Sequence, residues 1–210
     1  AVTDELLDAD QWRMHPNRTE VTLRLEPNAS VFVIFRKPTK QNEGTGQVAK
    51  EPQRVQTLSQ PWQVQFDPAF GGPAQSQTFA ILSDWSQHAD SSIRYYSGTA
   101  TYAQTFQWSG EKGRYWLDLG KVATIAEVKL NGQSCGVAWT FPYRVELTPY
   151  LKAGENQLQI DVSNTWANRL MGDHRLPEKQ RITHTTAPYR LEGRPLLEAG
   201  LRGPVQIMTR

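Results

Sequence analysis

The stretch that decides the fold runs from residue 113 to residue 164: GRYWLDLGKVATIAEVKLNGQSCGVAWTFPYRVELTPYLKAGENQLQIDVSN. Its last part, residues 157–162, reads QLQIDV, so every second side chain is apolar. This period of two is typical of a strand with one face in a core and the other in water. Asn131-Gly132 separates two such runs and favours a tight hairpin, because both residues tolerate positive φ. The stretch therefore predicts antiparallel β-sheet.

The same alternation predicts the core of an all-β fold. Between Gly136 and Leu147, the rings of Trp139, Phe141 and Tyr143 alternate with smaller residues. Large aromatic and aliphatic side chains of this kind fill the space between two packed sheets. We expect two packed antiparallel sheets across residues 61–210, with a shared core of Leu117, Leu119, Ile125, Val128, Leu130, Val145, Leu147, Leu158, Ile160, Val162, Val205 and Ile207.

Several segments resemble a known family. The segments that carry this resemblance are YSGTATYAQTF (96–106), LDLGKVATIAEVKLNG (117–132) and GVAWTFPYRVELTPYLKAGENQLQIDVSN (136–164). Together they resemble the sugar-binding domain of glycoside hydrolase family 2 and its relatives, a galactose-binding-like jelly roll. Farther on, WANRLMGDHRLPEKQR (166–181) and PLLEAGLRGPVQI (195–207) are similar to the C-terminal region of bacterial α-L-rhamnosidase-like enzymes of family 106.

The resemblance implies a fold, a partner and a location. The fold is an antiparallel β-sandwich of the galactose-binding-like jelly-roll type, and the ligand class is carbohydrate. In these families the catalytic acids lie on a separate (β/α)-barrel domain, and this chain shows no alternating strand and helix pattern of that kind. The resemblance also implies a bacterial, periplasmic or extracellular enzyme with its export signal upstream of residue 1. A structural calcium ion is the one cofactor that it suggests.

Composition divides the chain into three parts. Residues 20–36 read as two strands around 26–28, with a nearly continuous apolar run at 31–35. Two strands are not stable alone, so residues 1–36 are interpreted as the last strands of a preceding β domain. Residues 37–60 are poor in large apolar groups and are interpreted as a linker. Residues 61–210 are enough to bury a core of their own, as the jelly-roll domain.

Charge and cysteine content exclude several classes of function. The net charge is +2, and Lys and Arg form no dense block, so neither a nucleic acid nor a membrane surface is an expected partner. Cys135 is the single cysteine, so the chain forms no internal disulfide. The four histidines show no metal-ligand spacing, and we predict no transition-metal site.

The carboxylates do not suggest a catalytic pair. A glycosidase needs two carboxyl groups that flank the scissile bond. The candidates fall on outward strand positions or in turns, where a solvated surface acid is the simpler interpretation. We therefore predict no catalytic residue among Glu111, Asp118, Glu127, Glu146, Glu155 and Asp161.

Aromatic side chains are the first candidates for sugar contacts. The C–H groups of a pyranose pack on an aromatic face, while amide, carboxylate and guanidinium groups hold its hydroxyls. Each ring also has a simpler interpretation as part of the core. The tentative ligand-binding rings are Trp85, Trp139, Tyr143 and Trp166.

The segment 165–202 is the longest irregular one. Loops of this length are usually functional or disordered, and its many apolar residues favour an ordered one. We expect it to cover one edge or end of the sandwich and to turn polar side chains toward a catalytic domain. Arg169 and Asp173 stand four residues apart and would pair within a helical turn. The polar candidates are Asn168, Arg169, Asp173, His174 and Arg175.

These observations lead to one prediction and two alternatives. The chain is predicted to be a non-catalytic carbohydrate-binding or supporting β-sandwich from the C-terminus of a larger α-L-rhamnosidase-like glycoside hydrolase that acts on plant or host glycans. The alternatives are an independent carbohydrate-binding module and a purely structural sandwich between domains. Exposed aromatic rings in a cleft would favour the module, whereas a broad apolar patch would favour the structural role.

Overall fold

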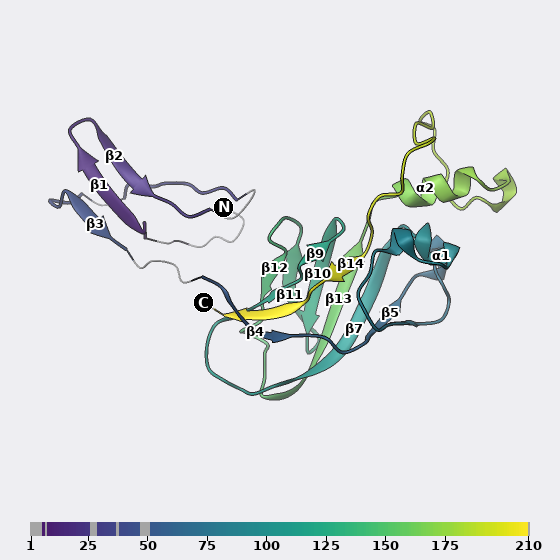
Figure 1. The fold of residues 1–210 in the computed structure, drawn as a ribbon, viewed down its shortest axis with the longest axis horizontal. Coiled ribbons are helices and arrows are strands. Elements are labelled where there is room, and N and C mark those ends of the chain that lie inside the picture. Colours follow the sequence, from purple (N-terminus) through teal and green to yellow (C-terminus); the bar gives the residue numbers. More distant parts are fainter. Residues whose placement is uncertain (1–5, 7, 26–28, 37, 47–50, 210) are drawn as a thin grey trace. The chain divides into compact units, whose positions relative to one another are not determined.

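The structure is a computed structural model that describes residues 6, 8–25, 29–36, 38–46 and 51–209. It divides into two compact units, one within the first 53 residues and one from Arg54 to Thr209 (Figure 1). Among the described residues, no helix is long and apolar enough to cross a membrane.

The first unit is a small antiparallel sheet. Its strands are β1 (Gln11–His15), β2 (Arg18–Thr22) and β3 (Glu43–Thr45), in the order β2-β1-β3. Trp12 of β1 lies over Gly44 of β3, where an added Cβ would come 2.6 Å from the indole Nε1. Glycine at this position therefore lets the indole pack flat on the neighbouring strand.

Two expectations for residues 20–60 differ from the structure. The strand predicted at 31–35 is wrong: this run has no regular structure, and all five of its apolar side chains are exposed. An apolar run forms a strand only with a partner to pair with, and none of the described residues pairs with it. The predicted turn at 26–28 lies outside the described residues. The range 37–60, predicted as a linker, contains β3 and β4 (Gln53–Thr57).

The second unit is an antiparallel β-sandwich, which confirms the predicted all-β fold. Its larger sheet has the order β11 (Gln133–Ala138), β10 (Ile125–Leu130), β13 (Gly154–Ser163), β7 (Thr99–Trp108), β5 (Trp62–Gln65) and β6 (Gln77–Phe79). The second sheet has the order β12 (Arg144–Glu146), β8 (Tyr115–Asp118), β15 (Gln206–Thr209) and β4. A short pair joins β14 (Leu201–Gly203) and β9 (Lys121–Val122). Because β4 belongs to the second sheet, this unit begins at Arg54 and not at the predicted Pro61.

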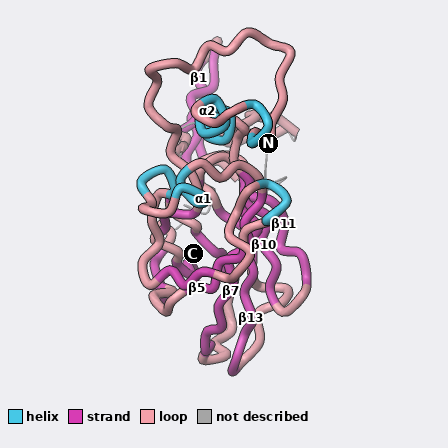
Figure 2. Tube along the Cα trace, turned by 90° about the vertical axis from the view of Figure 1, so that its right-hand side faces the viewer, coloured by secondary structure: helices cyan, strands magenta, loops and turns pink. Residues whose placement is uncertain are grey.

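Short helices lie between the strands. They are the α-helices α1 (Ser91–Arg94) and α2 (Ala167–His174) and the 3-10 helices η1 (Pro68–Phe70), η2 (Trp85–Gln87) and η3 (Glu178–Gln180). Figure 2 shows α1 and α2 at the same end of the sandwich, beyond the ends of β5, β7 and β13. The side chains of Asp67, Asp84 and Asp90 cap η1, η2 and α1, each by accepting a backbone N–H.

The core lies between the inward faces of the sheets. Eleven of the twelve predicted core residues are buried in one hydrophobic cluster. The exception is Ile125, which is partly exposed, because the inward positions of β10 are Ala126, Val128 and Leu130. Successive residues of a strand point to opposite faces, so Ile125 shares a face with the polar side chains.

We predict that truncating Ile160 in this core costs stability. The side chain is fully buried, so Ile160→Ala should lower the free energy of unfolding by about 2–5 kcal/mol. Ile125→Ala is the matched control, because the same truncation at a partly exposed position should cost clearly less. Urea denaturation of both variants checks this, and equal losses in the two would contradict the assigned faces.

Candidate functional site

Helix α2 carries most of the polar residues predicted for the site. It begins shortly after β13 ends and has no side-chain cap at Trp166, so packing stabilises it more than local bonds do. Gly172 lies against Tyr95, where an added Cβ would come 2.8 Å from the Cβ atom of the tyrosine. Because glycine has no side chain, α2 can pack directly against Tyr95, the residue that follows α1.

Asn168 and Asp173 are buried and form internal contacts. The Asn168 amide donates to the carbonyl of Leu197 at 2.7 Å and accepts from its N–H at 2.8 Å. Asp173 Oδ2 accepts from the N–H groups of Ile182 at 3.1 Å and Thr183 at 2.8 Å, and from the Thr183 hydroxyl at 2.6 Å. These two side chains therefore hold the segment after α2 in place.

Arg169 forms the ion pair predicted with Asp173. Its guanidinium Nη2 lies 2.9 Å from Asp173 Oδ1, and both side chains are almost fully buried. Its backbone N–H donates to Ser97 Oγ, which joins α2 to the start of β7. The Nε atom of Arg169 is buried and has no hydrogen-bond partner among the described residues.

His174 and Arg175 are the two predicted polar residues that reach the surface. The His174 ring stacks on Tyr189, with ring centroids 3.8 Å apart and planes 11° apart. Arg175 donates to the hydroxyl of Tyr95 at 2.6 Å, and its guanidinium lies 5.4 Å from the centre of that ring. These two side chains are accessible to a partner, whereas Asn168, Arg169 and Asp173 are not.

The four predicted aromatic residues separate into two groups. Trp85 is fully buried and donates from Nε1 to the Tyr102 hydroxyl at 2.6 Å, so its ring is core and offers no face to a sugar. Tyr143 is partly buried and packs against the core. Trp139 and Trp166 are exposed, and Trp166 meets Phe70 edge to face at 5.5 Å.

Trp139 belongs to an apolar stripe that begins on the edge strand β11 and continues into the loop after it. Val137, Trp139 and Phe141 are exposed by 48%, 58% and 44%, and they occupy alternate positions along β11 and the loop that follows it. We call these three residues the β11 stripe. The alternation in the sequence predicts Trp139 and Phe141 as core-filling rings and Trp139 also as a sugar contact, and it assigns no role to Val137. The exposure of both rings shows that they lie outside the core. An exposed apolar group of this kind is typical of an interaction surface.

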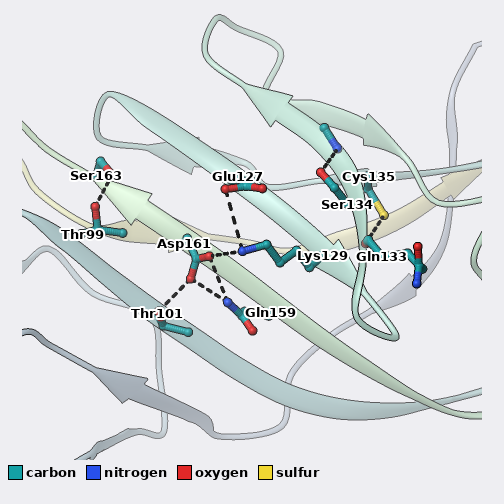
Figure 3. A network of polar contacts seen from close by, with 11 residues as sticks. Thr99, Thr101, Glu127, Lys129, Gln133, Ser134, Cys135, Gln159, Asp161 and Ser163 are labelled. Carbon is teal, nitrogen blue, oxygen red and sulfur yellow. Dashed lines mark hydrogen bonds and ion pairs between the residues drawn. The ribbon is translucent and has the colours of Figure 1, made fainter.

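The outward face of the larger sheet carries a polar network (Figure 3). Asp161 of β13 accepts from Thr101 of β7 at 2.7 Å and from Lys129 of β10 at 3.0 Å. Gln159 donates to both carboxylate oxygens, at 3.0 and 2.9 Å. Burial acts to raise the pKa of Asp161, but these hydrogen bonds outweigh it and hold the pKa below its ordinary value.

Two carboxylates of the smaller sheet are also paired with cations. Asp118 lies 2.6 Å from Arg144, and Glu146 lies 2.9 Å from Arg114. The hydrogen bond from Arg114 lowers the pKa of Glu146. A glycosidase acid instead needs a raised pKa so that it is protonated at working pH. These carboxylates are therefore arranged as structural ion pairs.

The described residues offer no group of three or more His, Cys, Asp or Glu that could hold a metal ion. A calcium ion would depend here on carbonyl oxygens, and the predicted structural calcium stays a prediction.

The second unit is an antiparallel β-sandwich. It has a polar network on the outward face of its larger sheet, exposed apolar residues on and after the edge strand β11, and helix α2 at one end. A family model described as glycosyl hydrolase 2 galactose-binding domain-like matches residues 82–195. This match covers more than half of the chain, and the chain belongs to that family. The predicted resemblance is thereby confirmed.

Two relatives are similar to this chain in amino-acid sequence. A putative β-glucuronidase from Formosa agariphila is 42% identical over 134 residues, which are 62% of this chain and 11% of that protein. A rhamnosidase structure from Novosphingobium sp. PP1Y is 39% identical with a TM-score of 0.82, over 95% of this chain and 19% of that one. The chain therefore spans less than a fifth of either relative.

A third comparison supports the fold alone. The β-glucuronidase structure from Ruminococcus gnavus matches with a TM-score of 0.53 and 18% identity, over 77% of this chain and 30% of that one. Galactose-binding-like sandwiches of this kind occur in glycoside hydrolases that are much longer than this chain.

We predict that Asp173 is a structural anchor. Asp173→Ala would leave Arg169 buried without its partner and would free the N–H groups of Ile182 and Thr183, so we expect a loss of about 3–5 kcal/mol. Limited proteolysis should also cut between 176 and 196 faster than in the wild type. Arg175→Ala is the control, because its exposed side chain should change neither readout by much. Unchanged proteolysis of Asp173→Ala would show that other contacts hold the segment.

The pKa of Asp161 predicts a pH dependence of stability. Its folded-state pKa is lower than the ordinary 3.8, so its contribution is fully present above that value and is lost as pH falls through the folded pKa. Asp161→Asn should therefore be less stable than the wild type at pH 5 to 7, and this difference should shrink below about pH 4. Urea unfolding across this range, with Glu155→Gln on the same strand as the exposed control, measures the effect. A difference that grows toward low pH would contradict the assigned network.

Proposed function

We propose that this chain is a non-catalytic part of a larger α-L-rhamnosidase-like glycoside hydrolase. The observation that carries the proposal is the similarity to the Novosphingobium rhamnosidase along nearly the whole chain. The chain corresponds to a small share of that enzyme, which leaves ample length for a separate catalytic domain. Export of this enzyme to the periplasm or the exterior, and its action on plant or host glycans, stay predictions.

The ion pairs support the non-catalytic part of the proposal. A retaining or inverting glycosidase needs one protonated and one ionised carboxyl group on either side of the substrate. Glu146 and Asp161 accept hydrogen bonds from Arg114 and Lys129, which favour the ionised forms of these two carboxyl groups, and Asp118 forms an ion pair with Arg144. Because their pKa values are lowered, neither Glu146 nor Asp161 is suited to donate a proton to a leaving group.

The exposed apolar groups support docking on a catalytic domain. The β11 stripe exposes three apolar side chains, one from the edge strand and two from the loop after it, and exposed apolar surface of this kind is typical of an interaction site. His174 and Arg175, which are exposed at the C-terminal end of α2, add groups that can donate hydrogen bonds. We propose a (β/α)-barrel of the same polypeptide as the partner of these surfaces.

A second candidate activity follows from the other relative. The Formosa protein is named as a putative β-glucuronidase, and its identity to the matched part of this chain is comparable to that of the rhamnosidase. The complete enzyme could therefore release a uronic acid in place of rhamnose. The two candidates differ in the charge of the sugar removed, which an assay separates directly.

We predict that the 210-residue chain alone hydrolyses neither 4-nitrophenyl α-L-rhamnoside nor 4-nitrophenyl β-D-glucuronide. The longer protein that contains it should release nitrophenol from the rhamnoside. Colorimetric rates for the chain and the longer protein, prepared in parallel, test both statements. Release from the glucuronide alone would favour the second candidate. Turnover by the isolated chain that is abolished in Asp161→Asn would overturn the non-catalytic assignment.

A further inference from the structure

The first unit has no core of its own. None of its described residues is buried, whereas the sandwich of the second unit contains a cluster of large buried side chains. A small sheet is stable by itself only when an apolar face is covered, and the three strands here have five, five and three residues. The described part of the first unit therefore lacks the burial that a stable β domain needs.

The sheet of the first unit has one apolar face and one polar face. Alternate residues of a strand share a face, so one face carries Trp12, Met14, Thr19 and Val21 of β1 and β2. Met14 is 44% exposed, and the other three side chains are only partly buried. The opposite face carries the ion pair between Arg13 and Glu43. An antiparallel sheet with two such faces packs its apolar face against a partner.

The connection between β2 and β3 has to return along this sheet. β1 pairs antiparallel with both neighbours, so β2 and β3 run in the same direction on opposite sides of it. The chain that leaves β2 at Thr22 therefore reaches Glu43 only by running back the length of the sheet. The exposed run 31–35 lies in the middle of this connection. In β-sandwiches a return of this kind is commonly a strand of the facing sheet.

The run 31–35, VFVIF, is apolar at every position. Phe32, Ile34 and Phe35 are exposed by 76%, 60% and 75%. In a strand, alternate side chains point to opposite faces, so both faces of this run would be apolar. Strands with this composition are typically buried on both faces. A contiguous exposed group of this size is therefore typical of an interaction surface.

We infer that the first unit completes a β-sandwich whose other sheet lies in the polypeptide N-terminal to residue 1. The run 31–35 pairs with the edge of that sheet through main-chain hydrogen bonds, and the face that carries Trp12 and Met14 covers its apolar side. This goes beyond the proposed function, which assigns no role to the first unit. It rests on the proposed function in one respect, because it requires the chain to be part of a longer polypeptide.

Length and chain order favour the N-terminal polypeptide as the partner. The chain corresponds to only 19% of the Novosphingobium rhamnosidase and 11% of the Formosa protein, so a longer enzyme of this kind has room for the missing sheet. Strands that follow one another in sequence are usually neighbours in space. On its C-terminal side the first unit is followed by a sandwich that already has its own core. The missing strands are therefore placed before β1.

Hydrogen exchange of residues 31–35 in the 210-residue chain and in the longer protein tests the inference. These residues form no strand pairing among the described residues, so their amides should exchange almost unprotected in the 210-residue chain. In the longer protein, pairing with the second sheet should slow them at least about a hundredfold. The amides of β7 and β13 are the internal control, because they should be protected in both proteins.

Ile34→Asp in the longer protein gives a second measurement. A charged side chain is costly to bury, so this variant should lose most of the protection of 31–35. Ile81→Asp is the matched control, because Ile81 is 82% exposed and lies in the second unit. It should leave the exchange of 31–35 unchanged. In the 210-residue chain, neither substitution should shift the urea midpoint by much.

The inference is wrong if 31–35 exchanges equally fast in both proteins, or if Ile34→Asp leaves its protection unchanged. It is also wrong if the 210-residue chain already protects the run. Protection that rises with protein concentration would place a second copy there, and protection independent of concentration would show that this chain covers the run itself. Failure of the proposed function looks different, because the longer protein would then release nitrophenol from neither glycoside, whatever the exchange of 31–35.

Discussion

The pairing of β7 with β13 is the constraint on which the rest of the sandwich depends. Ten consecutive residue pairs join these strands, from Thr99 with Ser163 to Trp108 with Gly154. Each strand alternates strictly, so this ladder fixes the buried face and the polar face together. A slip of one residue would turn Tyr102 and Ile160 toward water and the network around Asp161 into the core. The same register therefore determines both the hydrophobic core and the polar face around Asp161.

The same ladder positions the end of the sandwich. Asn164, directly after β13, accepts from the N–H of Gly98 and donates to the carbonyl of Tyr96, so the two strands are tied where they end. Helix α2 follows at once, and its buried Asn168 binds Leu197 in turn. Gly200 then passes Trp85 so closely that an added Cβ would come 2.4 Å from the indole. The long segment after β13 is therefore held by side-chain contacts at several points along its length.

The sequence predicts local alternation well and tertiary contacts poorly. The period of two correctly predicted that Leu158, Ile160 and Val162 are buried, because the alternation of side chains along one strand does not depend on which strands pair with it. It failed at Ile125, where the strand places Ala126 inward, and at 31–35, where an apolar run has no described partner strand. At the candidate site, Asn168 and Asp173 are buried, but asparagine and aspartate also contact ligands at protein surfaces, so the residue type alone does not distinguish the two roles. Only their partners, about 10 to 30 residues away in sequence, show that they are anchors.

The polar network around Asp161 illustrates why sequence alone could not find such a cluster of side chains. Thr101, Lys129 and Asp161 are separated by tens of residues and become neighbours only through the strand order β10-β13-β7. The exposed β11 stripe is different, since Val137, Trp139 and Phe141 are close in sequence and their alternation is visible there. Their exposure, however, depends on which elements pack around the end of β11, and only the structure shows this.

Hydrogen exchange measured residue by residue tests the central claim most directly. If the β7 and β13 ladder organises the sandwich, its amides near Tyr102 and Ile160 should exchange only through global unfolding, with the free energy that urea denaturation gives. Amides of the short edge strand β6 should exchange much faster. Exchange in β7 and β13 as fast as in β6, or slower exchange confined to the four-stranded sheet, would contradict the account.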